Sequence, residues 1–173
     1  MTDRVEAPAE RTRTFTWDDP LRGAHAARTM TGMEYLRAMM AGEFPPPPIA
    51  QALGFTLAEL EEGRVVFGVE PAEYHYNPIG MVHGGVAATL MDSAMGCAVH
   101  TRLPAGEGYT TLEMKINLLR AITMDTGPVR CEGSVIHLGR TTALAEARMM
   151  DSRGKLLAHA TSTCMILRPE PRG

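Results

Sequence analysis

The chain has few aromatic residues, few cysteines, no excess of positive charge and no long apolar run. Only 5% of its 173 residues are aromatic, and its formal net charge is −3. A phosphate-binding face needs an excess of lysine and arginine, so nucleic acid is not an expected partner. No apolar run approaches the roughly 20 residues that cross a bilayer, and the first residues contain no apolar segment like that of a secretory signal. We therefore expect a cytoplasmic protein with no membrane partner.

The cysteines and histidines are too scattered for a disulfide framework or a metal site. Cys97, Cys131 and Cys164 are odd in number and lack a CxxC spacing. The 6 histidines are equally dispersed, and no pair combines the spacing of helix ligands with a nearby carboxylate. We therefore expect neither a metal nor a cofactor. The 13 methionines suit irregular gaps in a core or, less commonly, the wall of an accommodating pocket.

Residues 1–48 are expected to form a polar tail, a short helix and a proline-rich connector. Residues 1–29 are polar with balanced charges, a composition typical of a poorly ordered segment or of one that drapes over the surface. Thr31 begins a capping-box pattern that predicts a helix over 31–41. The prolines at 45–48 end any helix and predict an extended connector, with an SH3-type ligand as the rarer alternative.

Residues 49–173 are expected to form one α+β domain. Alternating polar and apolar residues, separated by turn residues, predict six strands. One long helix, from His83 to about Thr101, lies between the second and the third strand, and it is expected to be buried because it is apolar nearly all round. This order predicts one antiparallel sheet wrapped around one buried helix. The expected strands are 54–61, 64–71, 110–118, 129–138, 141–151 and 156–167.

The start of that helix is one of two features that packing does not explain. His83, Gly84 and Gly85 would expose unpaired backbone N–H groups at the positive end of the helix dipole. Such amides can hold an anion or polarise a carbonyl oxygen. A tight turn that needs glycine for steric reasons is the alternative.

Asp92 is the second feature, because it is the single charge in an otherwise apolar helix. A buried carboxylate without a partner costs several kcal/mol, so Asp92 is expected to be paired, protonated or used in chemistry. It is a candidate base or nucleophile. The alternative is a structural aspartate that bonds to Thr89 or Ser93.

The string Asn77-x5-His83-Gly-Gly-x6-Asp92, with the strands around it, resembles the hotdog-fold acyl-CoA thioesterases of the phenylacetate-pathway (PaaI-like) type. The resemblance covers residues 50–168, essentially everything after the prolines. It implies a hotdog fold with an N-terminal helical extension outside the common core. It also implies hydrolysis of an acyl-CoA thioester, with an aromatic or a medium-chain acyl group, to the free acid and CoA.

The same resemblance implies catalytic roles for individual residues. The amide of Gly84, aided by that of Gly85, would polarise the thioester carbonyl. Asp92 would act either as general base or as nucleophile, and the sequence does not separate these routes. A hydroxyl on the following strand, from Thr111 or, one register off, from Thr110, would assist near the carboxylate.

Further residues are expected to support the loop or to bind the CoA moiety. Asn77, ahead of the loop, would position water or the substrate by the same resemblance. His83 is expected to hold the shape of the loop, with acid–base chemistry as the alternative, while His75 and His100 are expected in a loop and at a helix end. Family members often place CoA contacts on strand ends and hairpins, although an arginine at a turn is often only solvated. The candidates are Arg120, Gly139, Arg140 and Thr141.

Two other functions fit the sequence less well. A hotdog-fold hydratase or dehydratase acting on enoyl-thioesters needs a catalytic histidine paired with a carboxylate in a different loop. Here the carboxylate lies inside the helix that follows His83. A non-catalytic acyl-CoA-binding protein would bind CoA tightly without releasing a thiol.

Helix geometry predicts that one chain cannot form the whole site. Gly84 and Asp92 are 8 residues apart, which separates them by about 12 Å along a helix. A base or nucleophile must lie about 3–3.5 Å from the carbonyl carbon or its water. We therefore expect a two-fold homodimer in which Asp92 of one subunit faces the Gly84 loop of the other, and the resemblance implies doubling to a homotetramer. Glu113 is the candidate if a monomer supplies the missing group.

Overall fold

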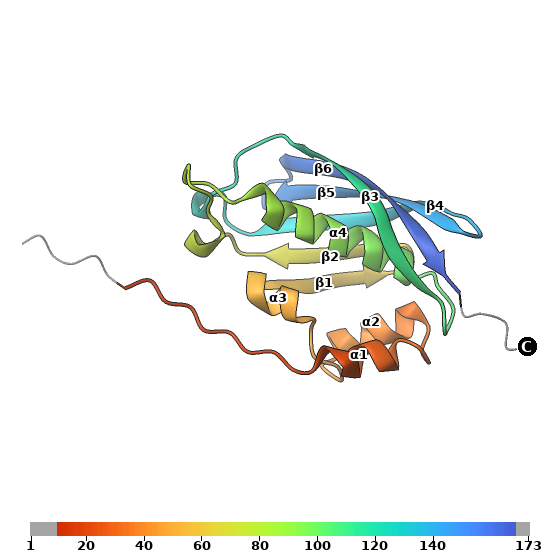
Figure 1. Ribbon diagram of the computed structural model, residues 1–173. Helices are drawn as coiled ribbons and strands as arrows, with labels where there is room; N and C mark the ends of the chain where they lie inside the picture. Colours follow the sequence, from red (N-terminus) through yellow and green to blue (C-terminus); the bar gives the residue numbers. More distant parts are fainter. Residues whose placement is uncertain (1–9, 169–173) are drawn as a thin grey trace, which may run out of the picture.

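A curved antiparallel sheet wrapped around one helix forms the centre of the computed structural model, which describes residues 10–168 (Figure 1). The 6 strands are ordered β1-β2-β4-β5-β6-β3, and α4 lies against one face. The chain order of two strands, a helix and four strands is the predicted one, so the expected α+β hotdog architecture is confirmed. The elements are β1 (Phe55–Glu61), β2 (Arg64–Val69), α4 (Gly84–His100), β3 (Gly108–Leu118), β4 (Val129–Leu138), β5 (Thr142–Asp151) and β6 (Leu156–Leu167), with short 3-10 helices η1 (Glu73–His75) and η2 (Met124–Thr126).

Helix α4 is buried over most of its circumference, as its composition predicts. Leu90, Met91, Ala94 and Met95 are completely covered by the sheet. The helix backbone comes very close to strand β4, where a Cβ added to Gly133 would lie 2.3 Å from the backbone carbonyl of Ala94. Glycine at this point of the strand is therefore required by the helix and not by a turn.

We expect Gly133→Ala to lower the free energy of unfolding by about 2–3 kcal/mol, because its methyl group would force the α4 backbone away from the sheet. Gly68→Ala on the neighbouring strand β2 is the matched control, since nothing lies within 4 Å of the added Cβ there. The control is expected to stay within about 0.5 kcal/mol of the parent. Urea unfolding of both variants checks this, and equal stabilities would show that the close approach at Gly133 is not needed.

One stripe of α4 is not covered by the sheet. Thr89, Asp92, Ser93 and Cys97 are only half-buried, and Gly85 at the start of the stripe is exposed. Their spacing of three and four residues places them on one side of the helix. A single chain thus leaves one face of its central helix open, and this face carries the carboxylate of Asp92.

Strand β3 is interrupted by an irregularity that its alternating sequence does not reveal. Its pairing with β6 shifts between Thr111 and Glu113. Leu112 is 55% exposed as a result, whereas Met114, further along the strand, packs against the core. A bulge of this kind re-aims the side chains on either side of it.

The N-terminal residues contain more helix than the sequence predicts. The capped helix is confirmed as α2 (Gly32–Met40), with both hydrogen bonds of the Thr31–Glu34 capping box present. The polar segment also contains a helix that the sequence did not predict, α1 (Pro20–Ala26), whose first turn is capped by Asp19. The first nine residues of the predicted tail lie outside the described residues.

The proline-rich stretch is only partly the extended connector that was expected. Pro48 begins helix α3 (Pro48–Leu53), because proline fits the first turn of a helix, where no N–H partner is needed. Helices α1, α2 and α3 lie beyond the β1 edge of the sheet (Figure 1). Helix α2 also reaches the end of α4, where a Cβ on Gly32 would overlap the carbonyl of His100.

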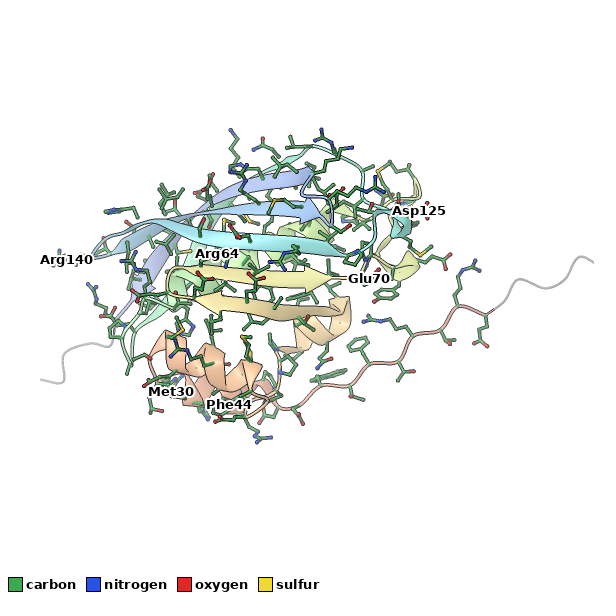
Figure 2. The ribbon with its side chains drawn as sticks, turned by 180° about the vertical axis from the view of Figure 1, so that it is seen from behind. Met30, Phe44, Arg64, Glu70, Asp125 and Arg140 are labelled. Carbon is green, nitrogen blue, oxygen red and sulfur yellow. The ribbon has the colours of Figure 1, made fainter. Side chains whose placement is uncertain are left out.

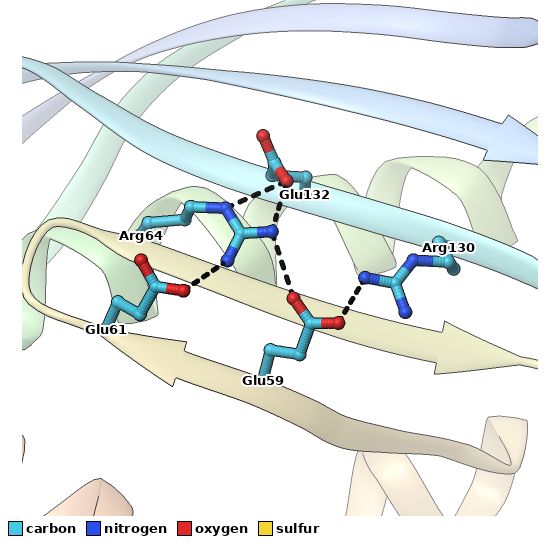
Figure 3. A network of polar contacts seen from close by, with 5 residues as sticks. All are labelled: Glu59, Glu61, Arg64, Arg130 and Glu132. Atoms are coloured by element: carbon cyan, nitrogen blue, oxygen red, sulfur yellow. Dashed lines mark hydrogen bonds and ion pairs between the residues drawn. The ribbon is translucent and has the colours of Figure 1, made fainter. Parts of the chain in front are cut away.

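The face of the sheet opposite α4 carries a network of charged side chains (Figure 3). Arg64 bridges Glu59, Glu61 and Glu132, and Arg130 contacts the same Glu59. Because these groups are partly exposed, their ion pairs add little stability. Within residues 10–168, no helix combines the length and the hydropathy needed to cross a membrane.

Candidate active site

The turn that leads into α4 is built around Asn77. The side-chain Oδ1 of Asn77 accepts hydrogen bonds from the backbone N–H groups of Ile79, at 3.1 Å, and Met81, at 3.3 Å. Its own backbone N–H donates to the carbonyl of Met81 at 2.8 Å. The carbonyl oxygen of the Asn77 side chain is therefore occupied by its own turn, and the side-chain amide is the part that can face a ligand.

His83 caps the first turn of α4. Its Nδ1 accepts the backbone N–H of Gly85 at 2.8 Å, and its carbonyl accepts that of Val86 at 2.9 Å. The Gly85 amide is thus already engaged and is not a free second donor. No partner within residues 10–168 accepts the N–H of Gly84. The Gly84 amide is therefore the one of the two that is open to a carbonyl oxygen, whereas the Gly85 amide would first have to leave His83.

His75 is a buried residue that braces this loop. Its Nδ1 accepts the N–H of Ala72 at 3.1 Å, and its Nε2 lies 2.8 Å from the carbonyl of Leu53. A neutral ring with hydrogen on Nε2 satisfies both contacts. The backbone carbonyl of His75 accepts the N–H of His83 at 2.8 Å, so the brace is directly joined to the cap of α4. The sequence placed His75 in a loop but gave no sign of this long-range contact.

A cleft of about 270 Å³ runs beside the Gly84 amide. Asn77 and Met81 line one part of it, and the segment from Leu118 to Ile122 lines the other. A Cβ on Gly84 would come within 2.7 Å of the Leu118 side chain, so glycine also keeps this cleft open. The cleft is large enough for part of an extended ligand beside an unpaired amide.

Asp92 is held by a hydroxyl group on strand β3. The Thr111 hydroxyl donates to Oδ1 of Asp92 at 2.8 Å, whereas Thr110 is exposed. The alternative in which Thr89 holds Asp92 is wrong, because the Thr89 hydroxyl donates to the backbone carbonyl of Gly85 at 2.9 Å. The bulge in β3 lies next to Thr111, so the irregularity occurs where the side chain meets the carboxylate.

Two thiols and a phenol near Asp92 are protonated at neutral pH. Loss of solvent contact raises the pKa of the Cys97 thiol to about 12, and the Asp92 carboxylate adds to this shift. Burial raises the pKa of Cys164 and raises that of Tyr109 well above its ordinary value. Neither thiol is a nucleophile, since the reactive form is the thiolate. Asp92 is therefore the group in this cluster that can take a proton or attack.

The two halves of the site do not meet in a single chain. Gly84 begins α4 and Asp92 lies two turns further on, a rise of about 12 Å. Glu113 does not supply the missing group, because its Oε1 accepts hydrogen bonds from the backbone N–H and the hydroxyl of Thr163, at 3.0 and 2.8 Å.

The residues expected to bind CoA are also separated within one chain. Arg120 shares a cavity with Asp125, whereas Arg140 lies at the other end of the sheet (Figure 2). Gly139 closes the β4–β5 hairpin by donating its N–H to the carbonyl of Thr142 at 2.8 Å, and the carbonyl of Thr141 accepts the N–H of Ile166. Within one chain, Arg120 lines the cleft beside Gly84, whereas the β4–β5 hairpin with Arg140 lies away from this cleft.

Comparisons with known proteins identify the family. Residues 79–158 match the thioesterase superfamily. A candidate esterase of Saccharolobus solfataricus is 34% identical over 120 residues, which make up 69% of this chain and 84% of that protein. The chain belongs to the thioesterase superfamily. All the site residues expected from the sequence, apart from Asn77, lie within the matched part of the chain.

Two further relatives are similar to this chain over nearly their whole length. A 1,4-dihydroxy-2-naphthoyl-CoA hydrolase of Listeria monocytogenes is 26% identical over 118 residues, 68% of this chain and 94% of that protein. A candidate thioesterase of Ralstonia eutropha JMP134, described as related to phenylacetic acid degradation, has a solved structure that is 28% identical. It superimposes with a TM-score of 0.69 over 76% of this chain and 98% of its own. The expected kinship with hotdog-fold thioesterases is confirmed.

Proposed function

We propose that this thioesterase hydrolyses acyl-CoA thioesters to the free acid and CoA. The observation that carries the proposal is the unpaired amide of Gly84 at the start of α4, which opens on a cleft. A thioester carbonyl placed there receives a hydrogen bond at the positive end of the helix dipole. The bond strengthens as negative charge develops on the oxygen, which lowers the barrier to attack.

Asp92 supplies the second part of the reaction. Its carboxylate either takes a proton from the attacking water or attacks the thioester carbon itself. The hydrogen bond from Thr111 fixes one carboxylate oxygen, and no group within residues 10–168 donates to the other, which can meet water or substrate. With Asp92 as base, the oxygen of water becomes part of the acid, the C–S bond breaks, and the proton held by Asp92 passes to the CoA thiolate. With Asp92 as nucleophile, the C–S bond breaks as an acyl–aspartate anhydride forms and CoA leaves as the thiol after it takes up a proton; water then hydrolyses the anhydride, which releases the acid and restores Asp92.

The complete site is formed between two subunits. Strand β3 is an edge of the sheet with an exposed Leu118, and Asp92 contacts this same strand through Thr111. Antiparallel pairing of two β3 edges covers the half-buried stripe of α4 with the same stripe of the partner. It also brings the Arg140 end of one subunit to the Gly84 end of the other, so both groups of CoA-binding candidates reach one substrate.

An aromatic acyl group fits the proposal better than a medium-chain one, because a relative is named as a hydrolase of an aromatic acyl-CoA. A thiol-release assay with a panel of aromatic and aliphatic acyl-CoAs tests the function. We expect hydrolysis of several members, with the highest kcat/KM for an aromatic one. If no acyl-CoA is hydrolysed while several raise the melting temperature, the protein is a binding protein and the proposal is wrong.

A further inference from the structure

A second, polar cavity adjoins the cleft of the candidate site. It has a volume of about 610 Å³ and lies between η2 and the turn that joins β5 to β6. Three cationic side chains line it, namely Arg120, Arg153 and Lys155, together with the carboxylates of Asp125 and Asp151. Nothing in the expected site included Arg153 or Lys155.

The three cations of this cavity outnumber its two carboxylates by one. One carboxylate oxygen of Asp151 accepts the backbone N–H groups of Arg153 and Lys155, both at 2.9 Å. These bonds, above all that from Lys155, lower the pKa of Asp151, and they hold its carboxylate against the turn backbone. The Arg120 guanidinium donates to the neutral carbonyl of Leu156. Within residues 10–168, none of the three cations forms a close ion pair with a carboxylate.

The polar cavity and the cleft beside Gly84 share a wall. Arg120 and Ala121 line both of them, so the two lie side by side along this segment. A thioester whose carbonyl lies at the Gly84 amide has its acyl group on one side of the carbonyl and its thiol part on the other. The thiol part of an acyl-CoA ends in phosphate groups, and guanidinium and ammonium groups bind phosphate strongly.

We propose that Arg153 and Lys155, with Arg120, bind the phosphate groups of the CoA part of the substrate. The proposal rests on the proposed hydrolysis of acyl-CoA and adds a subsite to it. The subsite belongs to the subunit whose Gly84 binds the carbonyl, whereas the Arg140 hairpin that reaches the same substrate comes from the partner copy. Its location thus distinguishes it from the hairpin contacts expected from the sequence.

Calorimetric titration of the dimer with CoA and with pantetheine, which lacks the phosphates, tests the subsite. In the double variant Arg153→Ala/Lys155→Ala, the Kd for CoA is expected to rise on the order of tenfold and to depend less on salt. The Kd for pantetheine is expected to stay unchanged. Alanine preserves the backbone N–H groups that bond to Asp151, so the turn is expected to keep its shape.

Arg148→Ala is the matched control, because Arg148 is an exposed arginine on the same strand that leads into the turn but does not line the cavity. Its Kd for CoA is expected to equal that of the parent. An unchanged Kd for CoA in the double variant would overturn the subsite, and so would an equal loss of affinity for pantetheine.

The failure of the subsite and the failure of the proposed function are separable. Hydrolysis of an acyl-pantetheine reports on Gly84 and Asp92 without involving phosphate, and it is expected to be the same in the parent and the double variant. If the parent and the double variant hydrolyse acyl-pantetheine at the same rate and bind CoA with the same Kd, the function holds and the subsite is wrong. If no thioester is hydrolysed, the function is wrong, and CoA binding still decides the subsite.

Discussion

Asp92→Asn is expected to abolish thioester hydrolysis and to leave the fold intact. The amide removes both the base and the charge, and the loss of a general base alone lowers kcat by about 10²–10⁴. The side-chain oxygen of asparagine can still accept the hydroxyl of Thr111, so the side chain is expected to keep its position. Thiol release under saturating acyl-CoA, together with the melting temperature, provides the measurement.

The control for this variant is Asp18→Asn, the same chemical change at an exposed residue remote from α4. It is expected to retain the parent kcat. A folded Asp92→Asn protein with the parent kcat would remove Asp92 from the mechanism. Single turnover in ¹⁸O-labelled water identifies the nucleophilic route if label enters the Asp92 carboxylate, because catalysis by Asp92 as a base places the label only in the acid product.

Gly84→Ala is expected to lower kcat by about 10²–10³-fold while changing KM much less. The methyl group crowds the carbonyl at the amide that stabilises the developing oxyanion, and loss of one such donor costs about 3–4 kcal/mol in the transition state. Steady-state kinetics on one good acyl-CoA substrate give both constants. Equal effects on kcat and KM would indicate a simple steric block.

The double variant Gly84→Ala/Leu118→Ala tests whether the methyl acts only by displacing a side chain. A Cβ on Gly84 would lie 2.7 Å from Leu118, which is 58% exposed and free to move. We expect kcat of the double variant to stay as low as that of Gly84→Ala. Recovery of kcat would mean that the added methyl group lowers kcat by pushing the Leu118 side chain into the cleft. The hydrogen bond from the amide at position 84 would then not be the cause.

The features that local patterns encode could be predicted from the sequence. The capping box at Thr31 encodes helix α2, and the alternation of polar and apolar residues encodes the six strands. The pairing of a glycine loop with Asp92 identified both halves of the site, because these residues lie close together in the chain. The distance between Gly84 and Asp92 could also be predicted, because the rise per residue of an α-helix is constant.

The features that depend on distant partners could not be predicted. The bulge beside Thr111 arises from its pairing with β6, which the alternation within β3 does not record. His75 braces the loop through the carbonyl of Leu53, a contact made possible only by the folding of α3 against the sheet. The need for glycine at position 133 comes from the backbone of α4, far away in the chain.

We propose that each site takes Gly84 from one subunit and Asp92 from the other. Mixing inactive Asp92→Asn subunits with inactive Gly84→Trp subunits tests it directly, because a mixed dimer holds one site in which both residues are intact. After full random exchange at equal concentrations, half of the dimers are mixed and each has one working site, so activity is expected to return to roughly a quarter of the parent value. Exchange is followed by mass spectrometry of the intact dimers. If mixed dimers form and no hydrolysis returns, the two residues do not act across the subunit interface.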